Sequence, residues 1–116
     1  MSIPYIQLRD GKKMPQLGLG TWAMREETEH AVSAALAMGY RHIDTAKMYG
    51  NEDAIGRAIR RSGISREDVF VTTKLLPSDH KYEDALRAID ESLRKLQMEY
   101  VDLYLIHWPD DLDRDP

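Results

Sequence analysis

The feature that most constrains this chain is a regular alternation of two kinds of segment. Runs rich in β-branched residues, such as residues 69–75, are followed by longer segments whose apolar residues recur at spacings of three and four, such as residues 83–97. The first pattern is typical of strands and the second of amphipathic helices. From residue 18 onward the order is β-α-β-α-β-α-β, and strands joined through helices pair in parallel. The sequence therefore predicts an α/β fold built on a parallel sheet.

The ends of these segments are marked by residues that favour turns. Gly39 and Gly63 follow the first two predicted helices, and glycine readily adopts the positive φ that ends a helix. Asn51 precedes the second helix and is expected to cap it. The expected strands lie within residues 17–22, 40–46, 69–75 and 101–106, and the expected helices within residues 26–38, 51–63 and 83–97.

A hairpin is expected before the alternating segments, because Asp10-Gly11 is a strong hairpin signal between the short runs 5–8 and 13–17. Right-handed crossovers then allow either an open α/β sheet or part of a closed barrel. A closed eight-stranded barrel takes about 250 residues. This chain of 116 residues supplies four strands and three helices, about half of such a barrel. We expect a single domain over 1–116, with a hairpin at 3–17, four strands and three helices at 18–109, and an acidic loop at 110–116.

The composition narrows the class of protein. The chain contains no cysteine, which excludes disulfides and thiolate metal sites. Its net charge of -4 offers no basic surface for nucleic acid, and no apolar run approaches the ~18 residues of a membrane span. The N-terminus has no basic region leading into an apolar core, unlike a secretory signal. The cytoplasm is therefore the expected location.

Polar and aromatic side chains stand where each predicted parallel strand ends. In chain order they are Thr21 and Trp22, Asp44 with Tyr49 in the loop after it, Lys74, and His107 with Trp108. The carboxyl ends of parallel strands meet at one edge of the sheet, and α/β proteins carry their chemistry there. Alternation along the strands places Asp44, Lys74 and His107 on the face that points inward in a barrel.

Each of these residues has an ordinary structural explanation when taken alone. A lysine in a strand usually snorkels at an edge, an aspartate before Thr-Ala is usually a turn residue, and a loop tyrosine or histidine commonly serves packing. Their convergence favours a functional interpretation, because lysine and aspartate are rarely buried unless they are paired. We expect Asp44 and Lys74 to pair on adjacent strands, beside Tyr49 and His107.

Such a set suits the transfer of a proton to a carbonyl group. A tyrosine with the usual pKa of about 10 is a weak acid at neutral pH, and a nearby ammonium lowers the pKa of a phenol. A carboxylate keeps the ammonium in place and protonated, and a histidine donates a hydrogen bond to a carbonyl oxygen. The sequence therefore predicts an acid/base site that protonates a carbonyl as hydride reaches its carbon.

Four motifs of this chain resemble those of the aldo-keto reductases, and of their bacterial diketogluconate-reductase-like members in particular. The motifs are Gly18-Leu19-Gly20-Thr21-Trp22, Gly39-Tyr40-Arg41-His42-Ile43-Asp44-Thr45-Ala46 followed by Tyr49-Gly50-Asn51-Glu52, Thr73-Lys74-Leu75, and Asp102-Leu103-Tyr104-Leu105-Ile106-His107-Trp108-Pro109. The resemblance covers essentially the whole chain, as the amino-terminal half of a TIM-type (β/α)8 barrel. It implies an oxidoreductase that uses NADPH to reduce aldehydes and ketones to alcohols.

The resemblance also implies a role for each residue at the strand ends. Tyr49 is then the general acid, Lys74 and Asp44 support it, and His107 orients the carbonyl substrate. The implied substrate pocket contains Trp22, Tyr49, His107 and Trp108. The implied contacts of the nicotinamide end are Gly20, Thr21, Trp22 and Asp44. The family's remaining cofactor contacts belong to the second half of the barrel, and Gly18-Leu19-Gly20 is too short for a dinucleotide phosphate loop.

Other classes of function stay open at this point. A Schiff-base lyase acting through Lys74 needs a deprotonated lysine, which a paired Asp44 opposes. A non-enzymatic half-barrel that associates through its exposed edges is a further alternative, with the missing barrel half or a second copy of the chain as its partner. No metal site is expected, because the four histidines lack ligand spacing and residues 110–115 lack the glycine and the distal glutamate of a calcium loop. These histidines are His30, His42, His80 and His107.

Overall fold

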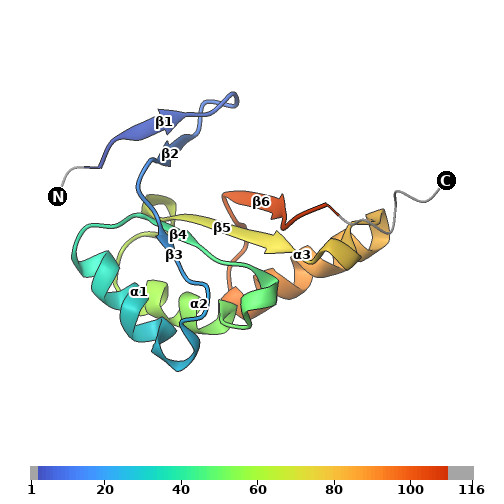
Figure 1. The fold of residues 1–116 in the computed structure, drawn as a ribbon. Helices are drawn as coiled ribbons and strands as arrows, with labels where there is room; N and C mark the ends of the chain where they lie inside the picture. Colours follow the sequence, from blue (N-terminus) through green and yellow to red (C-terminus); the bar gives the residue numbers. More distant parts are fainter. Residues whose placement is uncertain (1–2, 110–116) are drawn as a thin grey trace.

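The computed structural model describes residues 3–109, and its first element is the expected hairpin (Figure 1). Strand β1 (Tyr5–Gln7) pairs antiparallel with β2 (Lys13–Pro15). In the connecting turn, Gly11 has a φ of 90° and the carboxylate of Asp10 accepts a hydrogen bond from the backbone N–H of Lys12 at 3.0 Å. The hairpin is thus confirmed, with strands shorter than expected. The acidic loop predicted at 110–116 lies outside the described residues.

The remaining strands form one parallel sheet, in the order in which they occur in the chain. Each strand is hydrogen-bonded in parallel to the next one. The strands are β3 (Leu19–Gly20), β4 (His42–Asp44), β5 (Phe70–Leu75) and β6 (Leu103–Ile106). The predicted parallel α/β fold is therefore confirmed, with β3 and β6 at its edges.

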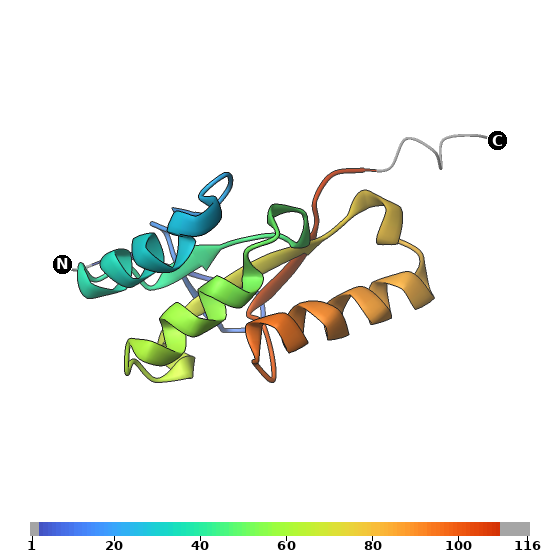
Figure 2. The ribbon, with the colours of Figure 1, turned by 90° about the horizontal axis from the view of Figure 1, so that it is seen from below.

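Three helices connect these strands, and all three cover the same face of the sheet. They lie beneath the sheet in Figure 1 and in front of it in Figure 2. The helices are α1 (Thr28–Ala37), α2 (Glu52–Arg61) and α3 (Tyr82–Leu96). A doubly wound open sheet has helices on both faces, whereas strands in chain order with helices on one face form a segment of barrel wall. Within residues 3–109, no helix is long and apolar enough to cross a membrane.

The helix ends follow the expected turn signals with small shifts. Gly39 after α1 has a φ of 107° and Gly63 after α2 has a φ of 75°, the left-handed backbone that glycine favours. Helix α3 ends one residue before the expected limit, because Gln97 itself adopts a φ of 54°. Single 3-10 turns occupy Arg25–Glu27 (η1), Lys47–Tyr49 (η2), Arg66–Asp68 (η3) and Pro77–Asp79 (η4).

The predicted capping role of Asn51 is wrong. Asn51 does stand immediately before α2, but its side chain makes no capping hydrogen bond. The side-chain amide instead points into the protein, where it bonds to Thr21 and Thr45. The first turn of α2 carries Glu52 and Asp53, and acidic side chains at this position favour a helix N-terminus electrostatically.

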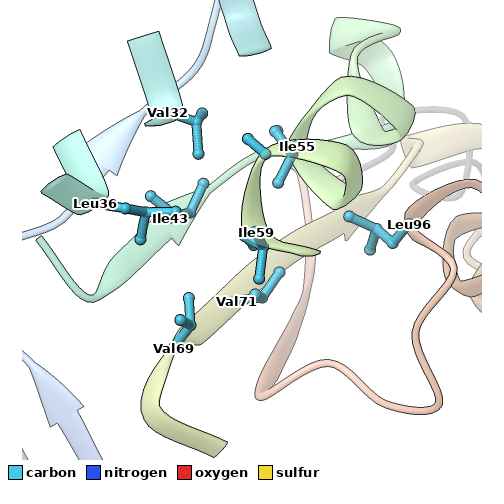
Figure 3. Packing of buried hydrophobic residues seen from close by; sticks show 9 residues of the cluster. Val32, Leu36, Ile43, Ile55, Ile59, Val69, Val71 and Leu96 are labelled. Carbon is cyan, nitrogen blue, oxygen red and sulfur yellow. The ribbon is translucent and has the colours of Figure 1, made fainter. Parts of the chain in front are cut away.

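The hydrophobic core lies between the sheet and its helices (Figure 3). Ile43 of β4 and Val71 of β5 are fully buried, and they pack against apolar side chains from all three helices. The cluster consists of Val32, Leu36, Ile43, Ile55, Ala58, Ile59, Val69, Val71 and Leu96. Because successive strand residues point to opposite faces, this core leaves Asp44 and Lys74 on the face away from the helices.

Gly56 allows α2 to pack directly against the end of α3. A Cβ atom at this position would lie 2.2 Å from the carbonyl oxygen of Leu96, which also accepts a hydrogen bond from Arg60 at 2.7 Å. We expect Gly56→Ala to lower the free energy of unfolding by about 1–3 kcal/mol, because the two helices must move apart. Equilibrium denaturation measures this loss. Gly20→Ala is the matched control, since the space around Gly20 is open, and equal losses in both variants would contradict the close-approach argument.

Candidate active site

The parallel register brings the carboxyl ends of β4 and β5 side by side. Asp44 ends β4 opposite Thr72 of β5, and Lys74 lies two residues further along the same face. The ammonium of Lys74 forms an ion pair with Asp44 Oδ1 and donates a second hydrogen bond to the Thr45 carbonyl at 2.9 Å. The Lys74 side chain is 13% exposed, against 41% for Asp44. The predicted pairing is confirmed, and it fixes the ammonium at the end of the sheet.

Tyr49 is held beside this pair by the tight turn η2. The turn follows Ala46, whose backbone is extended, and ends at Gly50, whose φ of 68° is left-handed. Within it, the Tyr49 N–H donates to the Ala46 carbonyl at 3.0 Å. The Tyr49 ring centroid lies 5.4 Å from the Lys74 ammonium, a distance typical of cation–π contacts. The expected meeting of Tyr49 with Lys74 is therefore present.

His107 lies against Tyr49 and comes from the strand beyond Lys74. It follows β6, and its backbone N–H continues the hydrogen bonding to β5 at 3.2 Å. Its ring centroid lies 5.6 Å from that of Tyr49 and 4.6 Å from that of Trp108, both in an edge-to-face arrangement. Its Nδ1 atom is buried without a hydrogen-bond partner. Burial and then the charge of Lys74 lower the pKa of His107, against an opposing effect of Asp44, so the neutral imidazole is favoured.

The end of β3 adds open space and an exposed aromatic ring to this edge. A Cβ on Gly20 would meet nothing within 4 Å, and Trp22 is 75% exposed. Thr21 is fully buried, and its hydroxyl donates to the Asp44 carbonyl at 3.0 Å, so its polar group faces the protein interior. Ala23 has a φ of 61°, which is uncommon for a residue other than glycine, and this conformation sets the path of the loop after Trp22.

Sequence reasoning missed two buried residues next to Tyr49. The carbonyl of Thr45 accepts a hydrogen bond from Lys74, and the Thr45 hydroxyl donates to the Asn51 side chain at 2.7 Å. The role of Thr45 depends on its backbone carbonyl, which the residue type does not reveal. Asn51 stands directly before a helix, where an asparagine is first interpreted as a cap. The only available signal was their place in the motif, on either side of Tyr49.

The same geometry bears on the two weaker chemical alternatives. Lys74 has two oxygen partners, and an ammonium held in this way is a poor nucleophile, which opposes a Schiff-base role. Within residues 3–109, no three or more His, Asp or Glu side chains are grouped so that they could hold a metal ion.

A cavity of about 640 Å³ lies at the opposite end of the sheet. It is lined by hairpin residues such as Tyr5 and Lys13 and by Arg41 and Phe70 near the strand starts. The carboxyl-end residues described above do not line this cavity. It is therefore separate from the candidate active site.

Known proteins resemble this chain in both sequence and fold. The family model described as Aldo/keto reductase family matches residues 16–114. The chain belongs to the aldo-keto reductase family. An aldo-keto reductase of Mycolicibacterium smegmatis is 56% identical over 107 residues, which cover 91% of this chain and 39% of that protein.

Solved aldo-keto reductases contain the same arrangement of strands and helices. The enzyme from Brucella melitensis matches with a TM-score of 0.90 and 57% identity, over 94% of this chain and 42% of that one. The Bombyx mori aldo-keto reductase, solved in complex with NADP, matches with a TM-score of 0.89 and 42% identity, over 94% of this chain and 39% of that one. The fold is that of aldo-keto reductase TIM barrels. The chain spans about two-fifths of the length of these relatives, less than the half expected from its strands.

The charges around His107 make its pKa a probe of this aldo-keto reductase site. We expect Lys74→Met to raise the pKa of His107, because the ammonium that opposes the imidazolium is removed while the carboxylate of Asp44 remains. Hydrogen–deuterium exchange at the imidazole C2 position, followed by mass spectrometry over a pH series, measures the pKa of each histidine. Lys13→Met, in β2 at the other end of the molecule, should leave it unchanged. A His107 pKa that stays the same or falls in the Lys74 variant would count against the observed geometry.

Proposed function

We propose that this chain supplies the proton-transfer machinery of an NADPH-dependent reductase that converts aldehydes and ketones to alcohols. The observation that carries the proposal is the convergence of Tyr49, Lys74 and His107 at one end of the sheet, with Asp44 bound to the lysine. Membership of the aldo-keto reductase family supports the reaction class. In this proposal Tyr49 is the general acid.

Lys74 assists Tyr49 through its charge. An ammonium 5.4 Å from the ring centroid stabilises the phenolate that forms when the phenol gives up its proton. Asp44 and the Thr45 carbonyl both accept hydrogen bonds from that ammonium, which hold it in position during the step. In this proposal the proton that reaches the substrate oxygen comes from the Tyr49 hydroxyl.

His107 orients the substrate. Burial and the nearby Lys74 lower the pKa of His107, and a neutral imidazole carries one N–H. This N–H donates a hydrogen bond to the substrate carbonyl oxygen and holds that oxygen near the Tyr49 hydroxyl. Trp22 and Trp108 are both exposed on this edge, and their rings offer apolar walls for the rest of the substrate.

The end of β3 fits the nicotinamide end of the cofactor. Gly20 leaves open space and Trp22 an exposed ring, while the carboxylate of Asp44 is partly exposed. Thr21 contributes indirectly, because its hydroxyl fixes the Asp44 backbone. When bound, NADPH supplies the hydride that adds to the carbonyl carbon. The four residues assigned to this part of the cofactor site are Gly20, Thr21, Trp22 and Asp44.

Removal of one hydroxyl group tests the role of Tyr49. In a barrel completed by joining residues 1–109 to the C-terminal part of the Mycolicibacterium smegmatis relative, we expect Tyr49→Phe to slow NADPH-dependent aldehyde reduction by about 10²–10⁴-fold, as for loss of a general acid. NADPH affinity, followed by fluorescence titration, should stay nearly constant because only proton donation is lost. Tyr82→Phe, at an exposed position of α3, is the matched control and should keep full turnover. Undiminished turnover of Tyr49→Phe would assign the acid to another group.

We further propose that a second barrel wall covers the open face and the free edges of this sheet. Leu105 and Ile106 of the edge strand β6 are 39% and 56% exposed, and Trp108 is 47% exposed. Exposed apolar strand edges pair with other chains, and burial of apolar surface stabilises by about 25 cal/mol per Å². The second wall comes either from a further segment of a longer polypeptide or from a second copy of this chain.

On its own, the 116-residue chain is expected to associate and to bind NADPH weakly. A monomer leaves the edges of β3 and β6 in water, and small domains have only about 5–15 kcal/mol of stability in total. Sedimentation measures the state of association, and calorimetry measures the NADPH affinity. A monodisperse monomer that binds NADPH at micromolar affinity or better would contradict this expectation. Association of the chain together with an inactive completed barrel would favour the interaction module over the reductase.

A further inference from the structure

One buried side chain connects three of the segments that form the proposed active site. Asn51 is 4% exposed, and its amide nitrogen donates to the Thr21 carbonyl at 2.9 Å and to the Thr28 hydroxyl oxygen at 3.3 Å. Its amide oxygen accepts a hydrogen bond from the Thr45 hydroxyl at 2.7 Å. All three threonines are fully buried. Both the donor and the acceptor side of this amide are therefore engaged inside the protein.

Two of these partners touch the proposed site directly. The Thr45 carbonyl accepts a hydrogen bond from the Lys74 ammonium at 2.9 Å. The N–H and the hydroxyl of Thr21 both donate to the Asp44 carbonyl, at 3.1 and 3.0 Å. Asn51 itself follows Tyr49 by two residues. A single amide thus links the ends of β3 and β4 to the turn that carries the tyrosine.

We propose that Asn51 is a positioning residue that holds the Tyr49 turn against the Asp44–Lys74 pair. It acts through Thr21 and Thr45. An asparagine before a helix usually caps the helix, but the Asn51 side chain makes no capping hydrogen bond to α2. The proposal rests on the role assigned to Tyr49 above, and it adds a residue whose function is to keep the phenol, the ammonium and the imidazole together.

The chemistry of the three partners explains why the side chain is an amide. The Thr21 carbonyl is an acceptor, and the Thr28 hydroxyl gives its own proton to the Arg25 carbonyl at 2.6 Å, so both can only accept a hydrogen bond from Asn51. The Thr45 hydroxyl needs an acceptor. An aspartate would set a buried carboxylate oxygen against the Thr21 carbonyl, and an alanine would remove the hydrogen bonds to all three partners. Either change removes buried hydrogen bonds that tie the segment after the turn to the ends of β3 and β4.

The test compares Asn51→Ala with the unaltered 116-residue chain, in the assembly that it forms. Hydrogen–deuterium exchange read by mass spectrometry applies at any assembly size, and it reports backbone amides and histidine pKa values together. We expect the amides of residues 46–50 to exchange about tenfold faster, because buried hydrogen bonds that hold the turn are lost. We also expect the pKa of His107 to rise, because burial lowers this pKa and a displaced Tyr49 ring no longer covers the imidazole.

Control variants separate positioning from general loss of stability. Val32→Ala opens the core under α1 and should lower stability while leaving the His107 pKa unchanged. Thr45→Val removes the hydroxyl that bonds to Asn51 and should shift both readouts in the same direction as Asn51→Ala but by less, whereas Thr45→Ser keeps the hydroxyl and should resemble the unaltered chain. If Asn51→Ala does not fold, the two Thr45 variants decide the question.

The proposal is overturned if Asn51→Ala leaves the His107 pKa unchanged, or shifts it no more than Val32→Ala does. It is equally overturned if Thr45→Val and Thr45→Ser behave alike. Neither measurement requires turnover, so a failure of this proposal is distinguishable from a failure of the proposed reductase activity. That activity is tested separately through Tyr49→Phe in the completed barrel.

Discussion

Parallel hydrogen bonding between strands that follow one another in the chain is the constraint on which the rest of the structure depends. Because β3 to β6 run in the same direction, their carboxyl ends and the loops after them gather at one edge. The connecting helices cover one face, so alternate strand residues divide between a first set packed against the helices, such as Ile43 and Val71, and a second set on the open face. Asp44 and Lys74 meet because they belong to that second set on adjacent strands.

The sequence predicted the fold and most of the proposed site because the relevant signals are local. The apolar spacing of α3 and the β-branched run of β5 gave elements within one or two residues of those observed, and opposite charges on adjacent strands predicted the Asp44–Lys74 pair. No local signal in the sequence distinguishes a barrel from an open sheet, because the difference depends on which face of the sheet each helix covers. The interpretation of Asn51 failed for a similar reason, because Thr21 and Thr28 lie 30 and 23 residues away and compete with the helix for its amide.

Two tyrosines show that surroundings, and not residue type, decide which phenol suits acid chemistry. Tyr49 lies beside the ammonium of Lys74 on the open face. Tyr104 lies in β6 with its hydroxyl buried and unpartnered, and burial together with the nearby carboxylate of Glu52 raises its pKa to about 12. Glu52 is itself buried and accepts a hydrogen bond from Thr73 at 2.6 Å. A phenol in such surroundings keeps its proton, so the helix side of the sheet stays chemically inert while the other side is suited to proton transfer.

The strand order also bears on how the protein is assembled during its synthesis. Partners in neighbouring strands lie 24, 28 and 31 residues apart along the chain, as in the pairs Leu19 and Ile43, His42 and Phe70, and Thr72 and Leu103. No described strand therefore waits for a distant part of the chain before it pairs, and contacts of modest sequence separation form quickly. A nascent polypeptide emerging from the ribosome can extend this sheet by one strand and one helix at a time. At each stage the newest strand is the edge that receives the next one.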